Sequence, residues 1–287
     1  MVAILRALDR LAQQFEIRCH GATVSTVVDK HIDKEMIVTP RHLTRTALVL
    51  HGGGGPATVA PIVAHLGTSM RVIAPTHPGW DGTARTDDIA SIADLAKVYL
   101  ARLRADDERD VVVVGSSIGG WIALEMAVQA AGDPQDGGTV GAIISIDGTG
   151  LVIEGEPGAD FFALDARGLA EAAWHDPERG YRNPATMSEA ERAVQQSNRQ
   201  AMAALTGPTM SDATLLERVG AIEVPTLLLY GASDRIVTPA YGRAVAAAIG
   251  DASFAEIPAA GHLPHLEEPA ATWAIIDAFL AAPGSLP

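Results

Sequence analysis

A chain of 287 residues is long enough for one α/β domain with a sizeable core, with or without an inserted segment. Hydrophobic residues make up 48% and charged residues 20% of the chain, which excludes an intrinsically disordered protein. The 21 basic and 35 acidic residues give a formal net charge of −14, which disfavours nucleic acids and anionic membranes as partners.

The N-terminal segment carries no pattern of a targeting signal. In residues 1–15, Arg6, Asp9 and Arg10 interrupt the apolar residues, which recur at helical spacing, so we expect a short amphipathic helix. The single cysteine, Cys19, excludes an internal disulfide and requires no oxidising compartment. No apolar run approaches the ~20 residues of a membrane span, so a soluble, cytoplasmic protein is expected.

Along the chain, strand patterns and helix patterns alternate. Residues 16–38 carry alternating and β-branched stretches, which predict antiparallel strands at a sheet edge. Further strands are predicted at 46–50, 69–75, 111–114, 141–146, 226–230 and 254–258, and helices at 91–103, 121–131, 240–249 and 272–281. This alternation predicts an α/β fold, with a mainly parallel central sheet and helices on both faces.

The character of the sequence changes between residues 151 and 211. Strand-like apolar runs disappear there, and Ala, Glu, Arg and Gln become frequent. We therefore expect a core domain of residues 1–150 and 212–287, with residues 151–211 forming a small helical cap inserted into it.

The pattern around Ser117 is the strongest local signal. Four valines, 111–114, predict a buried strand that stops at Gly115-Ser116-Ser117-Ile118-Gly119, directly before a predicted helix. Strand, tight turn and helix around Gly-x-Ser-x-Gly are typical of a nucleophile elbow. The register selects Ser117 rather than Ser116 as the exposed hydroxyl, whereas the pattern alone also fits an ordinary strand-to-helix turn.

A serine hydroxyl needs a base, and the base needs an acid that orients it. Candidates follow later strands of the sheet, where reactive groups gather at the carboxyl ends. Asp234 is the favoured acid, with Asp147 as its rival, and His262 is the favoured base, with His265 as the other candidate. Pro264 between the two histidines argues against a shared metal ion, and we expect no metal.

The order Ser117, Asp234, His262, each after a strand, resembles the α/β-hydrolase fold superfamily over about residues 46–280. Residues 231–237 are similar to its acid loop, and residues 261–269 to its histidine loop. The resemblance implies the α/β-hydrolase fold, a cap after the sixth strand, and an oxyanion hole formed by the backbone N–H groups of Gly53 and Ile118. It implies no cofactor. A serine at this position argues against the dehalogenase and epoxide hydrolase branches, which use aspartate.

Other residues near the predicted site are candidates for substrate binding, for shaping a loop or for packing. The loop containing His77 and Trp80 lines the site entrance in this fold, so both residues are candidates for substrate binding. His51 is expected to shape the glycine-rich loop that follows it, and that loop lacks the lysine of a nucleotide-binding P-loop. Trp174 and His175 are candidates for the substrate pocket or for packing of the cap.

The function expected is that of a serine hydrolase that cleaves a small-molecule carboxylic ester through an acyl-enzyme. The alternatives are a C–C bond hydrolase of ring-cleavage products or a lactonase, because the run of glycines at 52–55 also resembles the loop of C–C bond hydrolases. An alternative of another class is a small-molecule receptor that retains the triad. We expect a small molecule as the partner and a monomer or homodimer as the assembly.

Overall fold

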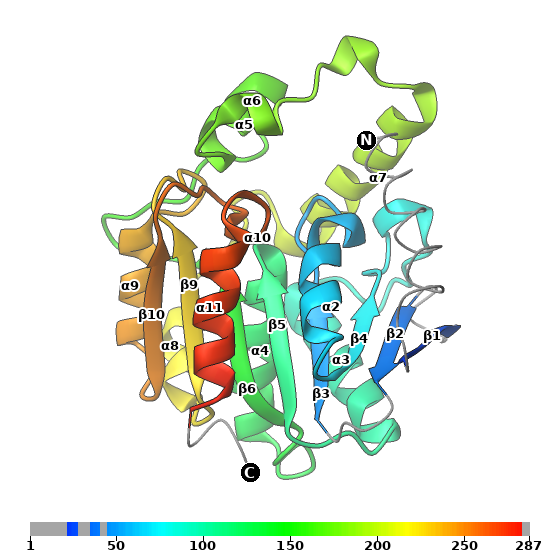
Figure 1. The fold of residues 1–287 in the computed structure, drawn as a ribbon, viewed down its shortest axis with the longest axis vertical. Helices are drawn as coiled ribbons and strands as arrows, with labels where there is room; N and C mark the ends of the chain where they lie inside the picture. The colour runs from blue at the N-terminus through cyan, green and yellow to red at the C-terminus, as the bar shows by residue number, and fades with distance from the viewer. Residues whose placement is uncertain (1–21, 28–34, 41–44, 283–287) are drawn as a thin grey trace.

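One eight-stranded sheet forms the centre of the computed structural model, which describes residues 22–27, 35–40 and 45–282 (Figure 1). The strand order is β1-β2-β4-β3-β5-β6-β9-β10. The strands are β1 (Ala22–Val27), β2 (Glu35–Pro40), β3 (Thr46–Leu50), β4 (Arg71–Pro75), β5 (Val111–Ser116), β6 (Val140–Ile146), β9 (Thr226–Gly231) and β10 (Ala252–Ile257). β2 runs antiparallel to β1 and β4, and the other neighbours are parallel. The prediction of a mainly parallel sheet with an antiparallel edge is confirmed. The helix predicted at 1–15 and Cys19 lie outside the described residues.

Helices cover both faces of this sheet (Figure 1). They are α2 (Ala60–Leu66), α3 (Ile92–Ala105), α4 (Ile118–Gly132), α8 (Leu215–Arg218), α9 (Pro239–Ala247), α10 (Pro264–Glu267) and α11 (Pro269–Leu280), with short 3₁₀ turns η1 (Pro56–Val59), η2 (Trp80–Gly82) and η4 (Val219–Ala221). None of these described helices has the length and apolar character needed to span a bilayer.

The valine run of β5 explains how the two faces are filled. Val111 and Val113 belong to the core that α3, α4 and α9 cover, and Val112 and Val114 to the core that α2 and α11 cover. Successive side chains of a strand point to opposite faces, so a strand buried on both faces must be apolar throughout. The four valines therefore fill both cores at once.

The first residues of α3 and α4 show how local sequence and packing determine where a helix begins. α3 begins at Ile92 because the Ser91 hydroxyl accepts a hydrogen bond from the Asp94 N–H, 3.1 Å away, and caps the helix. α4 begins at Ile118, three residues before the predicted start at Trp121. Glycines 119 and 120 lower helix propensity, yet both lie inside α4. Close packing against the sheet outweighs their low propensity.

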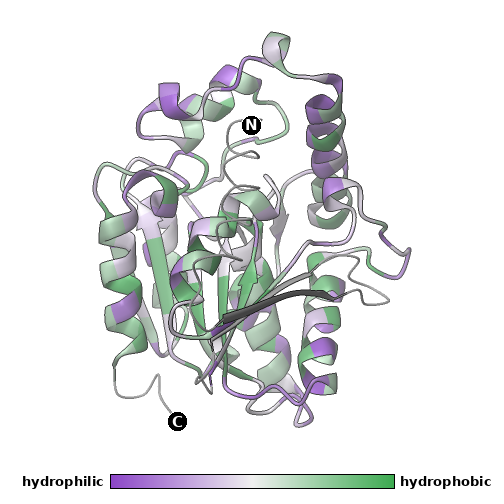
Figure 2. Cartoon of the chain, turned by 45° about the vertical axis from the view of Figure 1, so that its right-hand side comes forward, coloured by the Kyte–Doolittle hydropathy of each residue, from purple (hydrophilic) through white to green (hydrophobic). Residues whose placement is uncertain are grey.

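The segment 151–211, predicted as a cap, leaves the sheet after β6 and lies above its upper edge (Figure 1). It contains α5 (Ala166–Ala173), α6 (Pro177–Gly180), η3 (Pro184–Thr186) and α7 (Glu189–Thr206). Its helices are more hydrophilic than the central strands (Figure 2). Two short strands that the sequence pattern did not predict, β7 (Gly150–Leu151) and β8 (Ser211–Asp212), pair in parallel and close the base of the segment.

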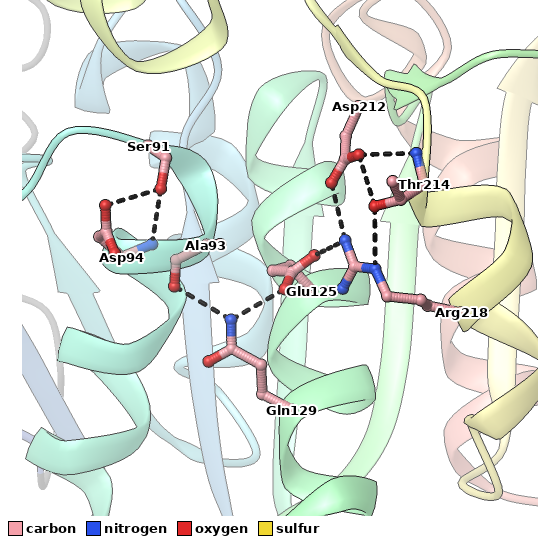
Figure 3. A network of polar contacts seen from close by, with 8 residues as sticks. All are labelled: Ser91, Ala93, Asp94, Glu125, Gln129, Asp212, Thr214 and Arg218. Carbon is pink, nitrogen blue, oxygen red and sulfur yellow. Dashed lines mark hydrogen bonds and ion pairs between the residues drawn. The ribbon is translucent and has the colours of Figure 1, made fainter.

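A polar network ties this base to the core (Figure 3). Glu125, in α4 and only 2% exposed, pairs with Arg218 of α8 at 2.9 Å. Arg218 also binds Asp212 of β8 at 2.7 Å. Gln129 donates to Glu125 at 2.8 Å and to the Ala93 carbonyl of α3 at 3.0 Å. The end of the inserted segment is thereby attached to α4, the helix that follows Ser117.

Candidate active site

Ser117 lies between β5 and α4 in a strained backbone conformation. Its φ of 58° and ψ of −120° place it outside the regions that a residue with a side chain usually adopts. Ser116 is buried, whereas Ser117 retains accessible surface. The turn therefore presents Ser117 rather than Ser116, as the register of the sequence pattern predicts.

The glycines on either side make this turn possible. A Cβ at Gly115 would lie 2.0 Å from the Gly119 carbonyl oxygen, and a Cβ at Gly119 would lie 2.2 Å from the Leu50 carbonyl oxygen. Neither contact is compatible with a side chain, because both partners are backbone atoms that cannot move aside. Steric contact with β3 and with the turn itself explains why both positions carry glycine.

Asp234 and His262 form a buried pair at the same edge of the sheet. Asp234 follows β9, and its Oδ1 accepts hydrogen bonds from the N–H groups of Ile236 at 2.8 Å and Val237 at 3.3 Å. Its Oδ2 lies 2.7 Å from His262 Nδ1. Since a carboxylate accepts, Nδ1 carries the proton and Nε2 is the nitrogen left for proton transfer.

Asp147, the rival acid, lies at the end of β6 beside this pair. Its Oδ1 accepts a hydrogen bond from the Gly231 N–H at 2.9 Å, and it is fully buried. Oxygen and nitrogen atoms of Asp147, Asp234 and His262 lie within 4.8 Å of one another, a spacing that could also suit a metal ion. However, His262 Nδ1 is already engaged by Asp234, which favours a hydrogen-bonded pair over metal ligation and favours Asp234 as the acid.

His77 and Trp80, the predicted substrate-binding residues, have no accessible surface. The His77 N–H donates to His51 Nε2 at 3.0 Å, and His77 Nε2 donates to the His51 carbonyl at 2.9 Å. Its Nδ1 bonds to the Tyr99 hydroxyl, and the ring centroids of His51 and His77 lie 3.7 Å apart with the rings tilted by 32°. Side chains sealed inside the protein cannot touch a ligand without moving, so this arrangement argues against direct substrate contact by His77 and Trp80.

Burial determines the charge of these two histidines. It lowers the pKa of His77 to about 4 and, together with the neighbouring His77, it lowers the pKa of His51 well below its usual value. Both rings are therefore neutral near pH 7. His51 Nδ1 donates to the Gly52 carbonyl at 2.7 Å, which agrees with its predicted role in shaping the glycine-rich loop.

That loop lies directly beside Ser117. A Cβ at Gly52 would lie 3.0 Å from the Ser117 Cβ, and a Cβ at Gly53 would lie 2.5 Å from the Met202 sulfur. Trp80 Nε1 donates to the Gly53 carbonyl at 3.1 Å. The predicted oxyanion loop therefore lies between Ser117 and α7 of the inserted segment, and its backbone is held by a buried tryptophan.

Glu267 is a buried residue near His262 that sequence reasoning missed. Its side chain accepts hydrogen bonds from the Gly261 N–H at 2.7 Å, the His175 N–H at 3.0 Å and the Asp176 N–H at 3.4 Å. The His262 N–H in turn donates to the Ala173 carbonyl at 2.7 Å. The histidine loop and the end of α5 are thus one hydrogen-bonded unit, which no local sequence signal could have revealed.

Trp174, His175 and His265 all have structural contacts. His175 Nδ1 lies 2.7 Å from the Ser233 hydroxyl, and Trp174 packs close to Gly180 and Gly261. His265 Nε2 donates to the Thr58 carbonyl at 2.9 Å, and burial lowers its pKa to about 4. The second candidate base is thereby committed to an internal hydrogen bond.

The other side of the inserted segment is attached through α7. Asn198 of α7 accepts from the Asp81 N–H at 2.8 Å and donates to Asp81 Oδ1 at 3.0 Å. The Ser197 hydroxyl donates to the Gly79 carbonyl at 3.2 Å. The segment is therefore anchored on both sides of Ser117, on the histidine loop and on the loop that contains Trp80.

A cavity of about 620 Å³ opens where the inserted segment leaves the core. Apolar parts of its wall come from the first residues of the segment and from the acid loop, and include Leu151, Ile153, Phe161, Ile236 and Val237. Of the described residues that line it, none is Ser117, Asp234 or His262. It borders the acid loop on the side of α9.

Comparison with known proteins places this chain in a family. The sequence model of the alpha/beta hydrolase family matches residues 47–275, which is most of the chain. The chain belongs to the alpha/beta hydrolase family. No curated protein sequence matches it significantly. The mainly parallel sheet with helices around it is consistent with this family.

Solved structures with the same fold include enzymes of several kinds. A putative lipase from Acinetobacter baumannii AYE is 18% identical, with a TM-score of 0.72 over 94% of this chain and 95% of its own. The carboxylesterase CesB from Bacillus subtilis is 16% identical, with a TM-score of 0.69 over 98% and 99%. The 2-hydroxy-6-oxo-6-phenylhexa-2,4-dienoate hydrolase from Rhodococcus sp. strain RHA1 is 17% identical, with a TM-score of 0.68 over 91% and 100%. At these identities the likeness to this alpha/beta hydrolase concerns the fold alone.

Proposed function

We propose that this alpha/beta hydrolase is a serine hydrolase that cleaves carboxylic esters of small molecules. The observation that carries the proposal is the strained, accessible Ser117 at the same sheet edge as a buried carboxylate–imidazole pair, His262 Nδ1 to Asp234 Oδ2 at 2.7 Å. Acyl transfer through serine requires an accessible hydroxyl as the nucleophile and an oriented imidazole as the base, and this edge of the sheet carries both. Esterase and lipase neighbours on the same fold support the choice of ester.

In this mechanism the Ser117 hydroxyl attacks the ester carbonyl while His262 Nε2 takes its proton. Asp234 holds the imidazole in the correct tautomer and stabilises its cation. The N–H groups of Ile118 and Gly53 stabilise the negative charge on the former carbonyl oxygen. His262 then protonates the departing alcohol, and water activated by the same imidazole hydrolyses the acyl-enzyme.

Residues 151–211 would act as a cap that covers this chemistry. Met202 approaches Gly53, and Ala173 accepts a hydrogen bond from the His262 N–H, so the cap borders both the oxyanion loop and the base. Exclusion of water strengthens the electrostatic interactions inside such a site. The partner in this proposal is a small molecule, and no cofactor takes part in any step.

The test is covalent labelling with a fluorophosphonate, followed by hydrolysis of a p-nitrophenyl ester series. Replacing Ser117 by Ala should abolish labelling and lower kcat by at least about 10³-fold. Ser116→Ala is the matched control, because Ser116 is the buried neighbour, and it should label as the wild type does.

Other outcomes separate the alternatives. Labelling at Ser117 with negligible ester turnover would favour dienoate C–C cleavage or lactone opening, to be assayed with those substrates. Labelling without turnover of any substrate, together with ligand-dependent shifts of the melting temperature, would favour a receptor. Turnover that survives Ser117→Ala would reject the serine mechanism altogether.

A further inference from the structure

Asp147 has an unusual position for a residue that is not a member of the predicted triad. Its carboxyl group is fully buried at the end of β6, one strand away from Asp234. Its backbone φ of 46° is positive, a conformation that aspartate adopts more readily than most residues with a side chain.

The two oxygens of Asp147 have different surroundings. Oδ1 accepts the hydrogen bond from the Gly231 N–H at 2.9 Å. Oδ2 is buried, and no N–H or O–H donor among the described residues reaches it. A carboxylate oxygen of Asp147 lies within 4.8 Å of one of Asp234, beside a ring nitrogen of His262. Two carboxylate oxygens are both acceptors, so this arrangement is favourable only when one of them carries a proton.

We propose that Asp147 is a neutral carboxylic acid that donates its proton to the Asp234 carboxylate and thereby acts as a positioning residue for the Asp234–His262 pair. Its role in catalysis rests on the proposed function, whereas the shared proton does not. Asp147 does not touch the reacting atoms and acts only through Asp234.

The groups that face Asp147 favour this assignment of the proton. Asp234 from the acid loop and Glu267 from α10 are carboxyl groups, and burial together with these two raises the pKa of Asp147 well above its usual value. The Gly231 N–H opposes that shift. Tyr230 of β9 is neutral, because burial raises its pKa well above 10. Asp234 faces His262, so Asp234 is the carboxyl group that keeps the negative charge.

A proton on Asp147 has a consequence for the base. A hydrogen bond donated to Asp234 withdraws negative charge from it and weakens its attraction for a protonated imidazole. The neutral, proton-accepting form of His262 is then more available near pH 7. Removing the donor should have the opposite effect and move the acidic limb of the pH–rate profile to higher pH.

Replacing Asp147 by Asn gives a sharp test, because an amide mimics the neutral acid. Its oxygen can accept from the Gly231 N–H, and its NH₂ can donate to Asp234. We expect Asp147→Asn to keep kcat/KM within about threefold of wild type and to leave the acidic limb in place. Asp147→Leu, which cannot donate, should raise the midpoint of that limb by about half a pH unit or more.

Two results would overturn the proposal. A fall of the midpoint in Asp147→Asn would mean that a negative charge had been removed, so that Asp147 is ionised in the wild type. An unchanged midpoint in Asp147→Leu would mean that Asp147 only holds the Gly231 loop in place and does not act on the Asp234–His262 pair. If the Leu variant fails to fold, Asp147→Ala, which is smaller and likewise cannot donate, replaces it in the same comparison.

Infrared difference spectroscopy tests the proton without any substrate. The wild type minus Asp147→Asn should show the C=O band of a protonated carboxylic acid at neutral pH, and it should persist after treatment with a chelator. Absence of the band would overturn the proposal of a shared proton. Appearance of the band only after chelation would overturn it as well, because a metal ion would then have occupied the cluster. A failure of Ser117 labelling would reject the proposed function and leave this band unaffected.

Discussion

Trp80 Nε1 donates a hydrogen bond to the Gly53 carbonyl across 3.1 Å, although the two residues are 27 positions apart. This bond holds the Gly53–Gly54 peptide, next to the peptide that carries the Gly53 N–H. The indole is completely buried and lies edge-on to the rings of His51 and His77, 5.7 and 5.6 Å away. A rigid aromatic support therefore holds the loop whose N–H group we propose as an oxyanion donor.

Trp80→Phe keeps an aromatic ring and removes this hydrogen bond. We expect kcat to fall by about three- to tenfold, equally for every ester of a p-nitrophenyl series, because the oxyanion loop loses its support. The smaller ring should also lower the free energy of unfolding by about 2 kcal/mol. Steady-state kinetics and urea unfolding measure the two effects.

The matched control is Trp273→Phe, because Trp273 stacks on His65 at 4.5 Å and lies in α11, away from Ser117. It should leave kcat unchanged. A change in KM from wild type to Trp80→Phe that depends on the acyl chain length would contradict a supporting role. It would indicate instead that Trp80 contacts the substrate.

Glu267 gives a second prediction about the site. Its carboxylate accepts from the Gly261 and His175 N–H groups and so joins the histidine loop to the inserted segment. Glu267→Gln puts an NH₂ group against one of these donors, which should cost about 1–3 kcal/mol of stability. With the loop of His262 loosened, we expect kcat to fall by about tenfold while fluorophosphonate still labels Ser117.

Glu268→Gln, at the next position, is the control and should be close to wild type in both measurements. Equal effects of the two substitutions would show that the hydrogen bonds of Glu267 are not what holds the loop.

Local patterns in the sequence predicted the parts of this molecule that are continuous in the chain. The valine run of β5, the glycine-bounded turn at Ser117 and the segments around Asp234 and His262 each occupy a few adjacent residues, and each depends on steric or strand preferences that act locally. The parallel order of the strands then follows from the connections, so the edge where these residues meet could be predicted as well.

Contacts between distant segments could not be predicted in this way. Asn198 and Asp81 are 117 positions apart, and His175 and Glu267 are 92 apart, so neither partner carries a local sign of the other. The burial of Trp80 could not be predicted for the same reason. A loop position suggests exposure, whereas here the loop folds back onto His51 and buries its own aromatic residue.

From the ion pair of Glu125 and Arg218 we predict that mutations at the base of the inserted segment lower the stability of the protein (Figure 3). Arg218→Met leaves a carboxylate in α4 that is almost fully buried and has lost its cation. We expect a loss of about 2 kcal/mol in the free energy of unfolding, discounted because Arg218 itself is one-third exposed. Adding Glu125→Gln to this variant should restore part of the loss, since the charge that lacked a partner is removed.

Arg167→Met is the comparison variant, because Arg167 pairs with Glu171 and Glu178 on the exposed surface of the cap. Its melting temperature should stay near that of wild type. If Arg218→Met is equally harmless, the buried network does not stabilise the fold.

The acid sensitivity of the fold follows from its buried histidines. Burial lowers the pKa of both His77 and His265 from 6.5 to about 4. Between these values the unfolded chain binds protons that the folded protein does not, so stability rises with pH and is lost as pH falls from about 6.5 toward 4. Each histidine should contribute up to about 3 kcal/mol to this loss, because one pKa unit corresponds to about 1.4 kcal/mol.

Urea unfolding at a series of pH values from 7.5 to about 4.5 measures the slope. His265→Gln should flatten it, because glutamine can still donate to the Thr58 carbonyl and does not titrate. The control is His65→Gln, since His65 is partly exposed and bonds to Asp277 on the surface. Loss of the slope in the His65 variant, with the slope intact in the His265 variant, would show that acid acts through surface groups instead.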